Sequence, residues 1–419
     1  MINKNIKIAI IGLGYVGLPL AIAFGKKYSV YGYDKDEKRV SNLKKKIDQN
    51  NDVSSKEFKK SKYLQFCSNE KKISTCNIYI ICVPTPVKKN FNPDLSKIVN
   101  STKMIAKYIS KNDIVIYEST VYPGLTEEIC VPILTKLSKL KYNIDFFCGY
   151  SPERINPADR SKKLTNIVKV TSGSTKKTAI KIDQLYSSII KAGTFMASSI
   201  KVAEAAKVIE NAQRDINIAF VNQLSIIFDK LNLKTHEVLE AASTKWNFAN
   251  YHPGFVGGHC IGVDPYYLSY KAKMEGVSSD LILAGRDINN QMPKFILSKI
   301  KKILKNKNTI IKKTNVLIAG LSFKKNCADT RNSQISHIVN FFLKNANNLT
   351  LYDPLVNAKF YNKIPILNKP SQIKSNFYNI LIVSVNHDIF KKQKKFFNNS
   401  LDKNNNEIFN IHNMLIGNE

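Results

Sequence analysis

Two glycine-rich segments of this chain carry residue types that can do redox chemistry. The first, Gly12-Leu13-Gly14-Tyr15-Val16-Gly17, has the spacing Gly-x-Gly-x-x-Gly and lies between an apolar run and an apolar helical pattern. In such a turn the first glycine permits a tight bend, the second a close approach to a pyrophosphate, and the third close packing of helix on strand. The segment predicts a dinucleotide site, with a structural glycine turn as the alternative.

The charge beyond this turn decides between NAD and NADP. Asp34 ends the next expected strand, where its carboxylate would hold a ribose diol and repel a 2′-phosphate. Arg39 follows closely and leaves NADP as the alternative. We expect NAD, and the cofactor-binding residues expected in this region are Gly12, Gly14, Tyr15, Val16, Gly17, Asp34 and Arg39.

The second segment, Gly257-Gly258-His259-Cys260, is suited to presenting a thiol. Paired glycines free the backbone to approach a substrate and to aim amide N–H groups. A catalytic cysteine needs thiolate character, which a nearby cation supplies. The alternative for any cysteine is a small buried apolar side chain, and we accept it for the other six. A redox cofactor together with a positioned thiol indicates oxidation through a covalent thioester.

Other polar groups follow expected strands or share a helical face. Glu153, in Ser151-Pro152-Glu153-Arg154, is a carboxylate on a rigid turn and could act as a base for water, the alternative being a surface ion pair with Arg154. Thr85 and Thr120 follow two strands and are placed to meet the nicotinamide half of a dinucleotide. Ordinary turn chemistry is the alternative for both threonines.

The amphipathic stretch before the cysteine loop adds two groups. Lys207 and Asn211 are four residues apart, so they share a face of a helix. A lysine and an amide on a mostly apolar stretch could stabilise an oxyanion. The alternative for Lys207 is a solvated lysine in a lysine-rich chain.

Strands and helices alternate at both ends of the chain, which predicts βαβ units and parallel sheets. The second region repeats the layout of the first, with a strand, a glycine turn, a helix and a strand with an acidic end. Between them, residues 199–231 read as a single long helix. We read no fold in the last fifteen or so asparagine-rich residues. The expected strands are 6–11, 29–33, 77–83, 113–118, 144–148, 315–320, 349–353 and 379–385.

Composition limits the class of protein. The net charge of +32 comes from 58 lysines and only six arginines, spread along the chain. Nucleic-acid recognition favours arginine, so a nucleic-acid-binding protein is the weaker alternative. The seven cysteines are scattered without Cys-x-x-Cys pairs, so we expect reduced thiols and no metal site. No apolar run reaches bilayer length and no signal segment is evident, so we expect a cytoplasmic protein.

These motifs resemble the UDP-glucose/GDP-mannose dehydrogenase family. The resemblance runs from about residue 6 to about 355, and its most specific element is the loop from Cys260 to Asp264. The loop and the segment 204–217 look most like the branch that acts on UDP-N-acetylhexosamines and makes uronates for surface polysaccharides. UDP-glucose and UDP-N-acetylmannosamine 6-dehydrogenases are alternatives, and a hydroxyacid-type dehydrogenase that uses one NAD is a more remote one.

The resemblance implies an α/β architecture, with two Rossmann-like, doubly wound parallel-sheet domains joined by a long helix and a central helical region. The expected domains are an NAD-binding domain (1–198), a central dimerisation and catalytic-loop domain (199–305) and a UDP-binding domain (306–419). It also implies a homodimer.

The resemblance further implies residue roles. Cys260 would be the nucleophile that converts an aldehyde, formed in a first oxidation, into a thioester in a second, before water releases the uronate. The groups expected to position water and stabilise charge are Thr120, Glu153, Lys207, Asn211 and Asp264. Cofactor contacts are also expected from Thr85, Thr120, Glu153 and Arg331. The residues expected to bind substrate are Arg154, Lys207, Asn211, Arg214, Gly257, His259 and Lys324.

Overall fold

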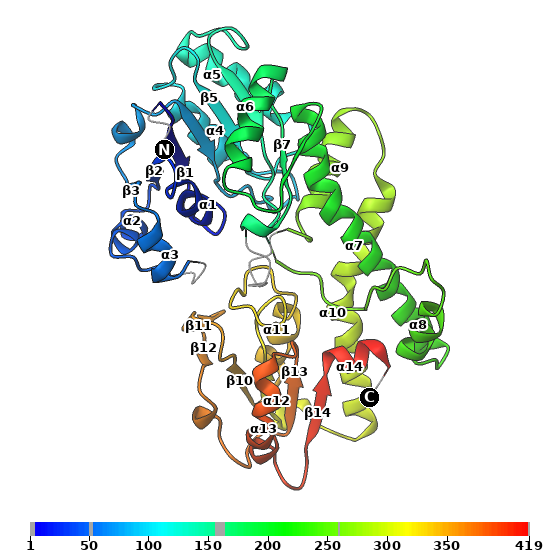
Figure 1. Ribbon diagram of the computed structural model, residues 1–419. Helices are drawn as coiled ribbons and strands as arrows, with labels where there is room; N and C mark the ends of the chain where they lie inside the picture. The colour runs from blue at the N-terminus through cyan, green and yellow to red at the C-terminus, as the bar shows by residue number, and fades with distance from the viewer. Residues whose placement is uncertain (1–4, 50–52, 156–163, 259, 418–419) are drawn as a thin grey trace. The chain divides into compact units, whose positions relative to one another are not determined.

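The computed structural model describes residues 5–49, 53–155, 164–258 and 260–417 of the chain. These residues form two compact units (Figure 1). The first unit is Met1–Glu210 with Tyr266–Ser278, and the second is Asn211–Pro265 with Ser279–Glu419. The helix α7, Ile200–Lys230, belongs to the first unit at its start and to the second thereafter. The predicted central segment, 199–305, is thus shared between the units, and the three-domain division stays a prediction.

The first unit is built on a six-stranded parallel sheet with the strand order β3-β2-β1-β4-β5-β6. This is the order of a dinucleotide-binding Rossmann sheet, so the predicted fold class is confirmed here. A separate parallel pair, β7 and β8, lies beyond it. The strands are β1 Lys7–Ile11, β2 Ser29–Tyr33, β3 Leu64–Cys67, β4 Ile78–Ile81, β5 Ile114–Tyr117, β6 Phe147–Tyr150, β7 Lys169–Thr171 and β8 Thr194–Met196.

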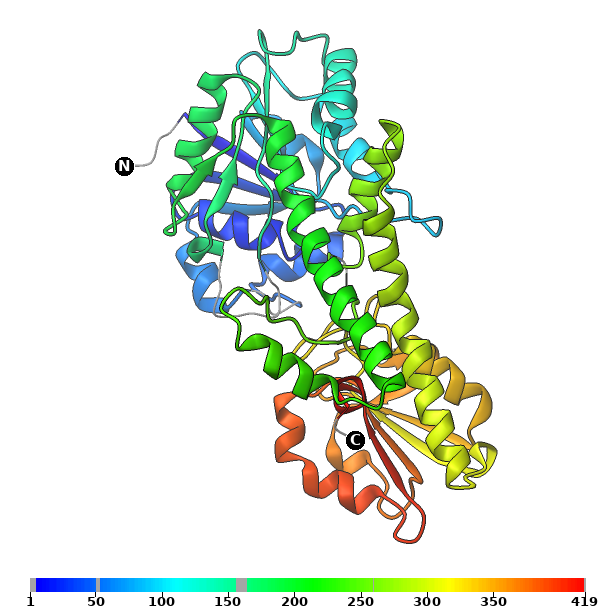
Figure 2. The same cartoon turned by 90° about the vertical axis from the view of Figure 1, so that its right-hand side faces the viewer.

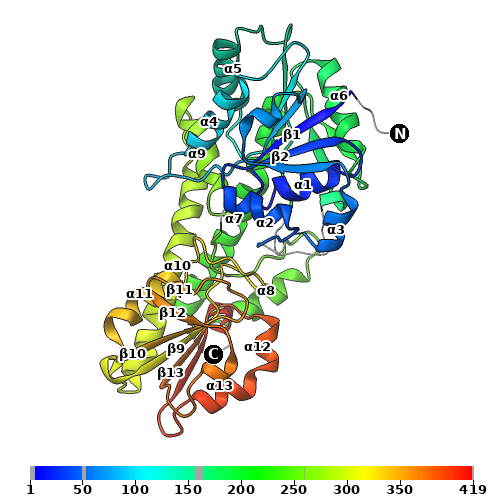
Figure 3. The ribbon, with the colours of Figure 1, turned by 90° about the vertical axis from the view of Figure 1, so that its left-hand side faces the viewer.

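Helices cover both faces of this sheet (Figure 3). On one face α1 and α6 pack together, with the ring centroids of Phe24 and Tyr186 5.5 Å apart. On the other face lie α4 and α5, where the hydroxyl of Thr102 lies 3.0 Å from that of Tyr117 in β5. The helices are α1 Gly17–Phe24, α2 Glu37–Lys44, α3 Ser55–Lys60, α4 Ser96–Ile105, α5 Val131–Ser138, α6 Lys176–Ser187 and, after the cysteine loop, α9 Asp264–Met274.

The second unit contains another six-stranded sheet, ordered β11-β12-β10-β9-β13-β14. All neighbours are parallel except β11, which pairs antiparallel with β12. Side chains alternate between two cores, so that Val316 and Ile318 face one and Leu317 and Ala319 the other. The strands are β9 Asn315–Ala319, β10 Asn348–Tyr352, β11 Phe360–Tyr361, β12 Ile364–Leu367, β13 Ile380–Val383 and β14 Glu407–Asn410.

Helices again lie on both faces of the sheet. The core on one face includes α10, α11 and α14, and the core on the other includes α12 and α13 (Figure 3). In this unit α7 runs beside α10 (Figure 2), and buried side chains of the two helices contact each other. The helices are α8 Thr235–Ser243, α10 Asp280–Asn306, α11 Ser336–Asn345, α12 Asp388–Lys392, α13 Lys394–Ser400 and α14 Ile411–Ile416.

The long helix is confirmed, because α7 has 31 residues. The asparagine-rich end, in which no fold was predicted, forms β14 and α14. Phe409, Met414 and Leu415 are buried there in the second sheet's core. The run of asparagines at 404–406 hides this short apolar pattern from a reading of the sequence.

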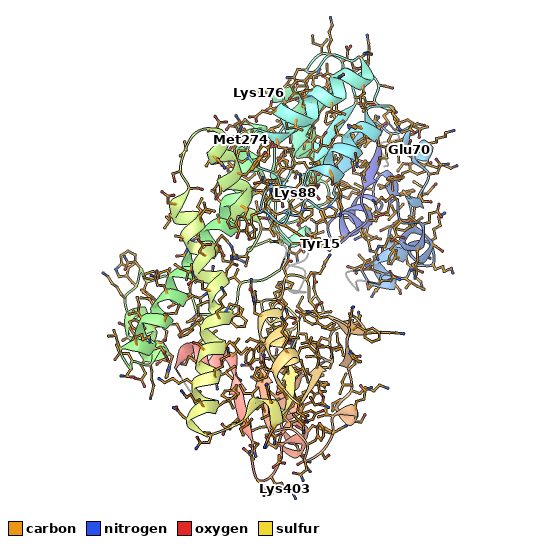
Figure 4. All side chains as sticks on the ribbon, turned by 180° about the vertical axis from the view of Figure 1, so that it is seen from behind. Tyr15, Glu70, Lys88, Lys176, Met274 and Lys403 are labelled. Carbon is orange, nitrogen blue, oxygen red and sulfur yellow. The ribbon has the colours of Figure 1, made fainter. Side chains whose placement is uncertain are left out.

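The outer surface of each unit is rich in lysine. Lys88, Lys176 and Lys403 are exposed, and Figure 4 labels them among the surface side chains. Within the described residues, no helix is both long and apolar enough to span a bilayer.

Candidate active site

The first glycine turn has the geometry that its spacing predicts. Gly12 has a φ of +91°, and its N–H donates to the carbonyl oxygen of Tyr33 at 2.9 Å. A Cβ on Gly17 would overlap the carbonyl oxygen of Gly12, so only glycine lets α1 pack so closely. Gly14 is exposed, and a Cβ there would meet no described atom within 4 Å. Its open side fits a cofactor that approaches the turn, and the adjacent Tyr15 and Val16 are half-buried.

The acidic end of β2 supports the turn from the next strand. Oδ2 of Asp34 accepts the N–H of Leu13 at 2.8 Å, and Oδ1 accepts the N–H of Asp36 at 3.0 Å. Asp34 is half-buried, which fits a carboxylate that can also reach a ribose. Arg39 is buried. Its Nε and Nη2 donate to the carbonyl oxygen of Leu13, and its Nη1 pairs with Asp48 at 2.7 Å. Arg39 thus holds the turn from within the protein, and its predicted contact with the cofactor stays a prediction.

The two threonines that follow β4 and β5 meet each other. Thr85 donates from Oγ1 to the carbonyl oxygen of Thr120 at 2.6 Å. Tyr267, in α9, donates to the carbonyl oxygen of Thr85 at 2.8 Å. The carboxyl edge of the sheet therefore brings together the loops that were expected to face the nicotinamide.

Glu153 follows β6 and is buried. Its Oε1 accepts the backbone N–H groups of Arg154 at 2.6 Å and Ile155 at 2.5 Å. The guanidinium of Arg154 pairs with Glu210 of α7 at 2.7 Å. The surface ion pair between Glu153 and Arg154, considered from the sequence, is therefore wrong. A buried carboxylate fixed by two amides fits a positioned base better than a solvated surface charge.

The face of α7 predicted to carry a lysine and an amide is partly enclosed. Lys207 is buried, with 7% of its surface exposed, so the solvated lysine considered as an alternative is wrong. Asn211, one turn later, donates from Nδ2 to Oδ2 of Asp264 at 2.5 Å. Asp264 begins α9 and is itself buried. Asn211 and Asp264, two of the groups predicted to stabilise charge, are therefore hydrogen-bonded to each other within the second unit. The candidate substrate residue Arg214 lies on an exposed part of α7.

Cys260 differs from every other cysteine of the chain. The other six are buried, as expected for small apolar side chains, whereas Cys260 is half-buried. Its carbonyl oxygen accepts the N–H of Asp264 at 2.8 Å, which joins the loop to the first turn of α9. The neighbouring candidate His259 lies outside the described residues.

The glycines before Cys260 serve a purpose that was not expected. A Cβ on Gly257 would lie 2.6 Å from the carbonyl oxygen of Asn332, and one on Gly258 would lie 2.7 Å from the ring of Phe323. Gly258 also has a φ of +84°. The paired glycines therefore let the cysteine loop pack against the loop after β9, whereas the sequence interpretation assigned them to approach of a substrate. The substrate contact of Gly257 stays a prediction.

A buried polar network supports the cysteine loop from α7 and α10. Asn222 accepts the N–H of Gly254 at 2.9 Å and donates to its carbonyl oxygen at 3.0 Å. Asn222 also donates to Asn289, which donates to Asp215. Arg286 pairs with Asp215 at 2.5 Å. The sequence interpretation missed this network, although Arg286 is one of only six arginines in the chain.

The second unit contains a cavity of about 690 Å³ at the carboxyl ends of β9 and β13. The strand order reverses between these neighbours, which is where ligands bind in open α/β sheets. Phe323, Lys324 and His387 line the cavity. Lys324 therefore lines a cavity, and its predicted contact with a ligand stays a prediction. Arg331 is exposed and pairs with Asp329 of its own loop at 2.9 Å, so its predicted cofactor contact stays a prediction.

Comparison with known proteins identifies the family to which these features belong. The UDP-glucose/GDP-mannose dehydrogenase family is described by models of three domains, and all three match. They are the NAD binding domain at residues 6–190, the central domain at 201–291 and the UDP binding domain at 317–416.

The chain belongs to the UDP-glucose/GDP-mannose dehydrogenase family. It is an NAD-dependent nucleotide-sugar dehydrogenase, and NAD is its cofactor. The similarity reaches residue 416, well beyond the limit near residue 355 drawn from the motifs.

Several proteins resemble the chain over nearly its full length. A UDP-N-acetyl-D-glucosamine 6-dehydrogenase of Salmonella typhi is 49% identical over 392 residues, covering 93% of this chain and 91% of that protein. One of Pseudomonas aeruginosa is 48% identical, covering 93% and 92%. Protein CapL of Staphylococcus aureus is 45% identical, covering 95% and 93%. The solved structure of a UDP-D-ManNAc dehydrogenase from Pyrococcus horikoshii aligns with a TM-score of 0.86 at 26% identity, covering 99% and 100%.

Proposed function

We propose that this dehydrogenase oxidises the C6 alcohol of a UDP-N-acetylhexosamine to the carboxylate through a thioester on Cys260. The observation that carries the proposal is the position of Cys260, the half-buried thiol in a chain whose other cysteines are all buried. The substrate class is supported by the identity of 49% with a UDP-N-acetyl-D-glucosamine 6-dehydrogenase.

The first unit holds the cofactor. The glycine turn gives the phosphates access to the N-terminus of α1, and Asp34 faces the ribose. NAD, when bound, accepts a hydride from the sugar carbon. Thr85 and Thr120 position the nicotinamide half from the carboxyl ends of β4 and β5.

The second unit supplies the nucleophile and holds the nucleotide. The thiolate of Cys260 adds to the C6 aldehyde and gives a tetrahedral thiohemiacetal, which can lose a second hydride where the aldehyde alone is a poor donor. Lys207 and Asn211 stabilise the developing oxyanion. Lys324 and the cavity after β9 bind the UDP moiety.

Water completes the reaction. Glu153 accepts a proton from water as it attacks the thioester carbonyl, and the C–S bond breaks to return the thiol of Cys260. Overall the alcohol, one water and two NAD⁺ give the carboxylate, two NADH and three protons. The balance requires no oxidant other than NAD.

The setting of the reaction follows from related proteins. We propose that the product feeds the synthesis of a surface polysaccharide in the cytoplasm, because CapL is a relative and because NAD and nucleotide sugars are cytoplasmic metabolites. We also propose a homodimer built on α7 and α10. Phe220, Ile227 and Leu281 are large apolar side chains left exposed on these helices.

A substrate panel tests the proposal. The purified enzyme with NAD is given UDP-GlcNAc, UDP-GalNAc, UDP-ManNAc, UDP-glucose and GDP-mannose, and NADH formation is followed. We expect the highest kcat/KM with UDP-GlcNAc or UDP-GalNAc. UDP-ManNAc is the second candidate, because the Pyrococcus horikoshii structure has the same fold over the whole chain. A preference for UDP-glucose or GDP-mannose would contradict the proposal.

A variant tests the covalent step. Cys260→Ser should stop before release of the uronate and leave sugar bound or half-oxidised, while binding NAD normally. Cys130→Ser, at a buried cysteine of the first unit, is the matched control and should turn over normally. Full conversion to the uronate by Cys260→Ser would refute the thioester.

A further inference from the structure

The two oxygens of Glu153 have different surroundings. Oε1 accepts two backbone N–H groups, from Arg154 and Ile155. Oε2 is buried and accepts no hydrogen bond from any residue that the structure describes. The Nζ atom of Lys169 lies 3.6 Å from Oε2, close enough for attraction but beyond a hydrogen bond. Oε2 is therefore the oxygen that can take a proton.

Lys169 is a buried cation that the reaction as described above does not use. It begins β7, its side chain is 3% exposed, and Nζ donates to Oε2 of Glu118 at 2.8 Å. The ring of Tyr186, from α6, lies 5.4 Å from Nζ, and its hydroxyl donates to Oε1 of Glu118. Glu118 follows β5, so three elements of the first unit meet at this lysine.

Lys169 has one more acidic neighbour than a simple ion pair with Glu118 would give it. Glu118 alone would neutralise Lys169, yet the lysine also faces Glu153, so two carboxylates share one cation. Burial tends to lower the pKa of Lys169, but the charges of Glu118 and Glu153 outweigh it and raise the pKa, so the lysine stays protonated. The ammonium group of Lys169 lies 3.6 Å from Oε2, and a cation at this distance attracts a carboxylate more strongly than a protonated carboxyl group.

We propose that Lys169 is a positioning residue that keeps Glu153 ionised and its Oε2 ready to take a proton from the hydrolytic water. The inference rests on the proposed role of Glu153 as the base and adds the group that sets its proton affinity. Glu118 and Tyr186 hold the lysine in place.

Other ionisable groups near Glu153 do not replace Lys169. Cys82, after β4, interacts with Glu153, but burial raises the pKa of its thiol well above the usual value, so it is neutral. Burial likewise raises the pKa of Tyr186. The guanidinium of Arg154 is directed to Glu210. Lys207, on α7, is also buried in this unit, and its charge adds to any field at the site.

A titration of the free enzyme tests the inference without substrate. The carboxyl carbon of Glu153 is followed by ¹³C NMR in glutamate-labelled protein, with Glu153→Gln assigning the signal. In Lys169→Met the pKa of Glu153 should rise by about one unit or more, a tenfold change in proton affinity, whereas Lys169→Arg should restore most of the original value. An unchanged pKa in Lys169→Met would overturn the inference, even if the enzyme proves to be the proposed dehydrogenase.

Turnover provides the second readout. Lys169→Met should keep an initial burst of about two NADH per active site, because both oxidations precede hydrolysis. The acid limb of its pH–rate profile should shift to higher pH by the same amount, about one unit or more, with little change in the KM for NAD. Loss of the burst together with the steady-state rate would contradict the inference.

Two control variants separate this role from a structural one. Glu118→Gln removes the ion pair but leaves Lys169 beside Glu153, so the pKa of Glu153 should not rise. If Glu118→Gln raised it as Lys169→Met does, the lysine would act only through Glu118. Should Lys169→Met fail to fold, the charge-balanced Lys169→Met/Glu118→Gln variant decides, and its Glu153 should still titrate above the wild-type pKa.

Discussion

Gly12 in the first unit and Gly320 in the second begin turns that match hydrogen bond for hydrogen bond. Their φ angles are +91° and +88°. Each donates its N–H at 2.9 Å to the carbonyl oxygen of a tyrosine at the end of the neighbouring strand, Tyr33 for Gly12 and Tyr352 for Gly320. The repeated layout of strand, glycine turn and acidic strand end, predicted from the sequence, therefore extends to individual atoms.

The acidic ends of the neighbouring strands repeat as well. Oδ2 of Asp34 accepts the N–H of Leu13, and Oδ2 of Asp353 accepts the N–H of Leu321, both at 2.8 Å. The other carboxylate oxygen in each case accepts the N–H two residues later, at 3.0 Å. The carboxylate fixes the backbone of the turn in both units.

The two turns differ in what remains available to a ligand. Asp34 is half-buried, and α1 begins at Gly17, directly after the glycine motif. Asp353 is fully buried and lies 3.4 Å from Nε2 of His387. There α11 begins only at Ser336, after a long loop. The same backbone turn thus has a partly accessible carboxylate in the first unit and a fully enclosed one in the second.

The buried His387 connects Asp353 to the loop that follows β9. Nδ1 of His387 accepts the N–H of Asn326 at 2.9 Å, and Nε2 lies 3.3 Å from the hydroxyl of Ser322. Phe323 and Lys324 lie between these two anchoring points. The carboxylate proposed to hold a ribose in the first unit thus has a counterpart in the second unit that supports the loop of Phe323 and Lys324.

Removing the two carboxylates should give opposite results. Asp353→Ala leaves buried N–H groups and His387 without their acceptor, so we expect a loss of about 3–5 kcal/mol of stability. Asp34→Ala should cost less stability, because its carboxylate is only half-buried, but it should raise the KM for NAD about tenfold or more. Thermal unfolding and NAD titration of both variants check this. Equal loss of stability in the two variants would break the distinction between support and site.

The stability of the first unit should depend on pH through Glu204, a buried carboxyl group. Glu204, in α7, accepts the N–H groups of Gly124 at 2.5 Å and Thr126 at 3.0 Å. Burial raises its pKa to about 7. Because the folded-state pKa exceeds the unfolded value, the stabilisation is complete below about pH 4.5 and is lost as the pH rises through about 7. The loss amounts to about 3 kcal/mol.

Glu204→Gln is the matched variant for that titration. Its stability should lack this decline, so its unfolding free energy should gain on the wild type between pH 5 and pH 8. Denaturant unfolding at several pH values measures the difference. Parallel curves for the two proteins would show that Glu204 does not titrate in this range.

Adding a methyl group to each first glycine tests whether the turns are equivalent in the backbone. Gly12→Ala and Gly320→Ala both force alanine into a positive φ, and their Cβ atoms would lie 3.1 and 2.9 Å from carbonyl oxygens. We expect similar losses of about 2 kcal/mol. Gly12→Ala should weaken NAD binding and Gly320→Ala UDP binding, as isothermal titration can measure. Reversed ligand effects would contradict the assignment of the units.

The reactivity of the cysteine thiols should differ between the two units, and this is the smallest of the effects that we predict. The five cysteines of the first unit are buried, and burial raises the pKa of Cys76 to about 12 and that of Cys148 well above the usual value. Iodoacetamide should therefore label Cys260 at least about tenfold faster than any of them. Peptide mass spectrometry over time measures the rates, and UDP-GlcNAc should slow the labelling. Faster labelling of a cysteine in the first unit would contradict this.

The sequence predicted the parts of the site that are local in the chain. Gly12, Gly17 and Asp34 could be placed because a strand, a turn and a helix impose a fixed spacing on them. The half-buried Cys260 was singled out by its glycine neighbours, although those glycines prove to make room for Phe323 and Asn332.

The support of the site could not be predicted, because its partners are distant in sequence. Lys169 meets Glu118 across 51 positions, and His387 meets Asp353 across 34. A single lysine among 58 carries no signal of its own. Arg39 was considered as a cofactor contact because it follows Asp34 closely, but its guanidinium contacts Leu13 and Asp48. Only tertiary packing brings these groups together.

The stoichiometry of the reaction tests the central claim most directly. Limiting UDP-N-acetylhexosamine is converted completely in excess NAD, and the NADH formed is divided by the sugar consumed. Oxidation through a thioester on Cys260 predicts two NADH for each sugar and a uronate as the product. One NADH for each sugar, with an aldehyde or ketone as the product, would contradict it.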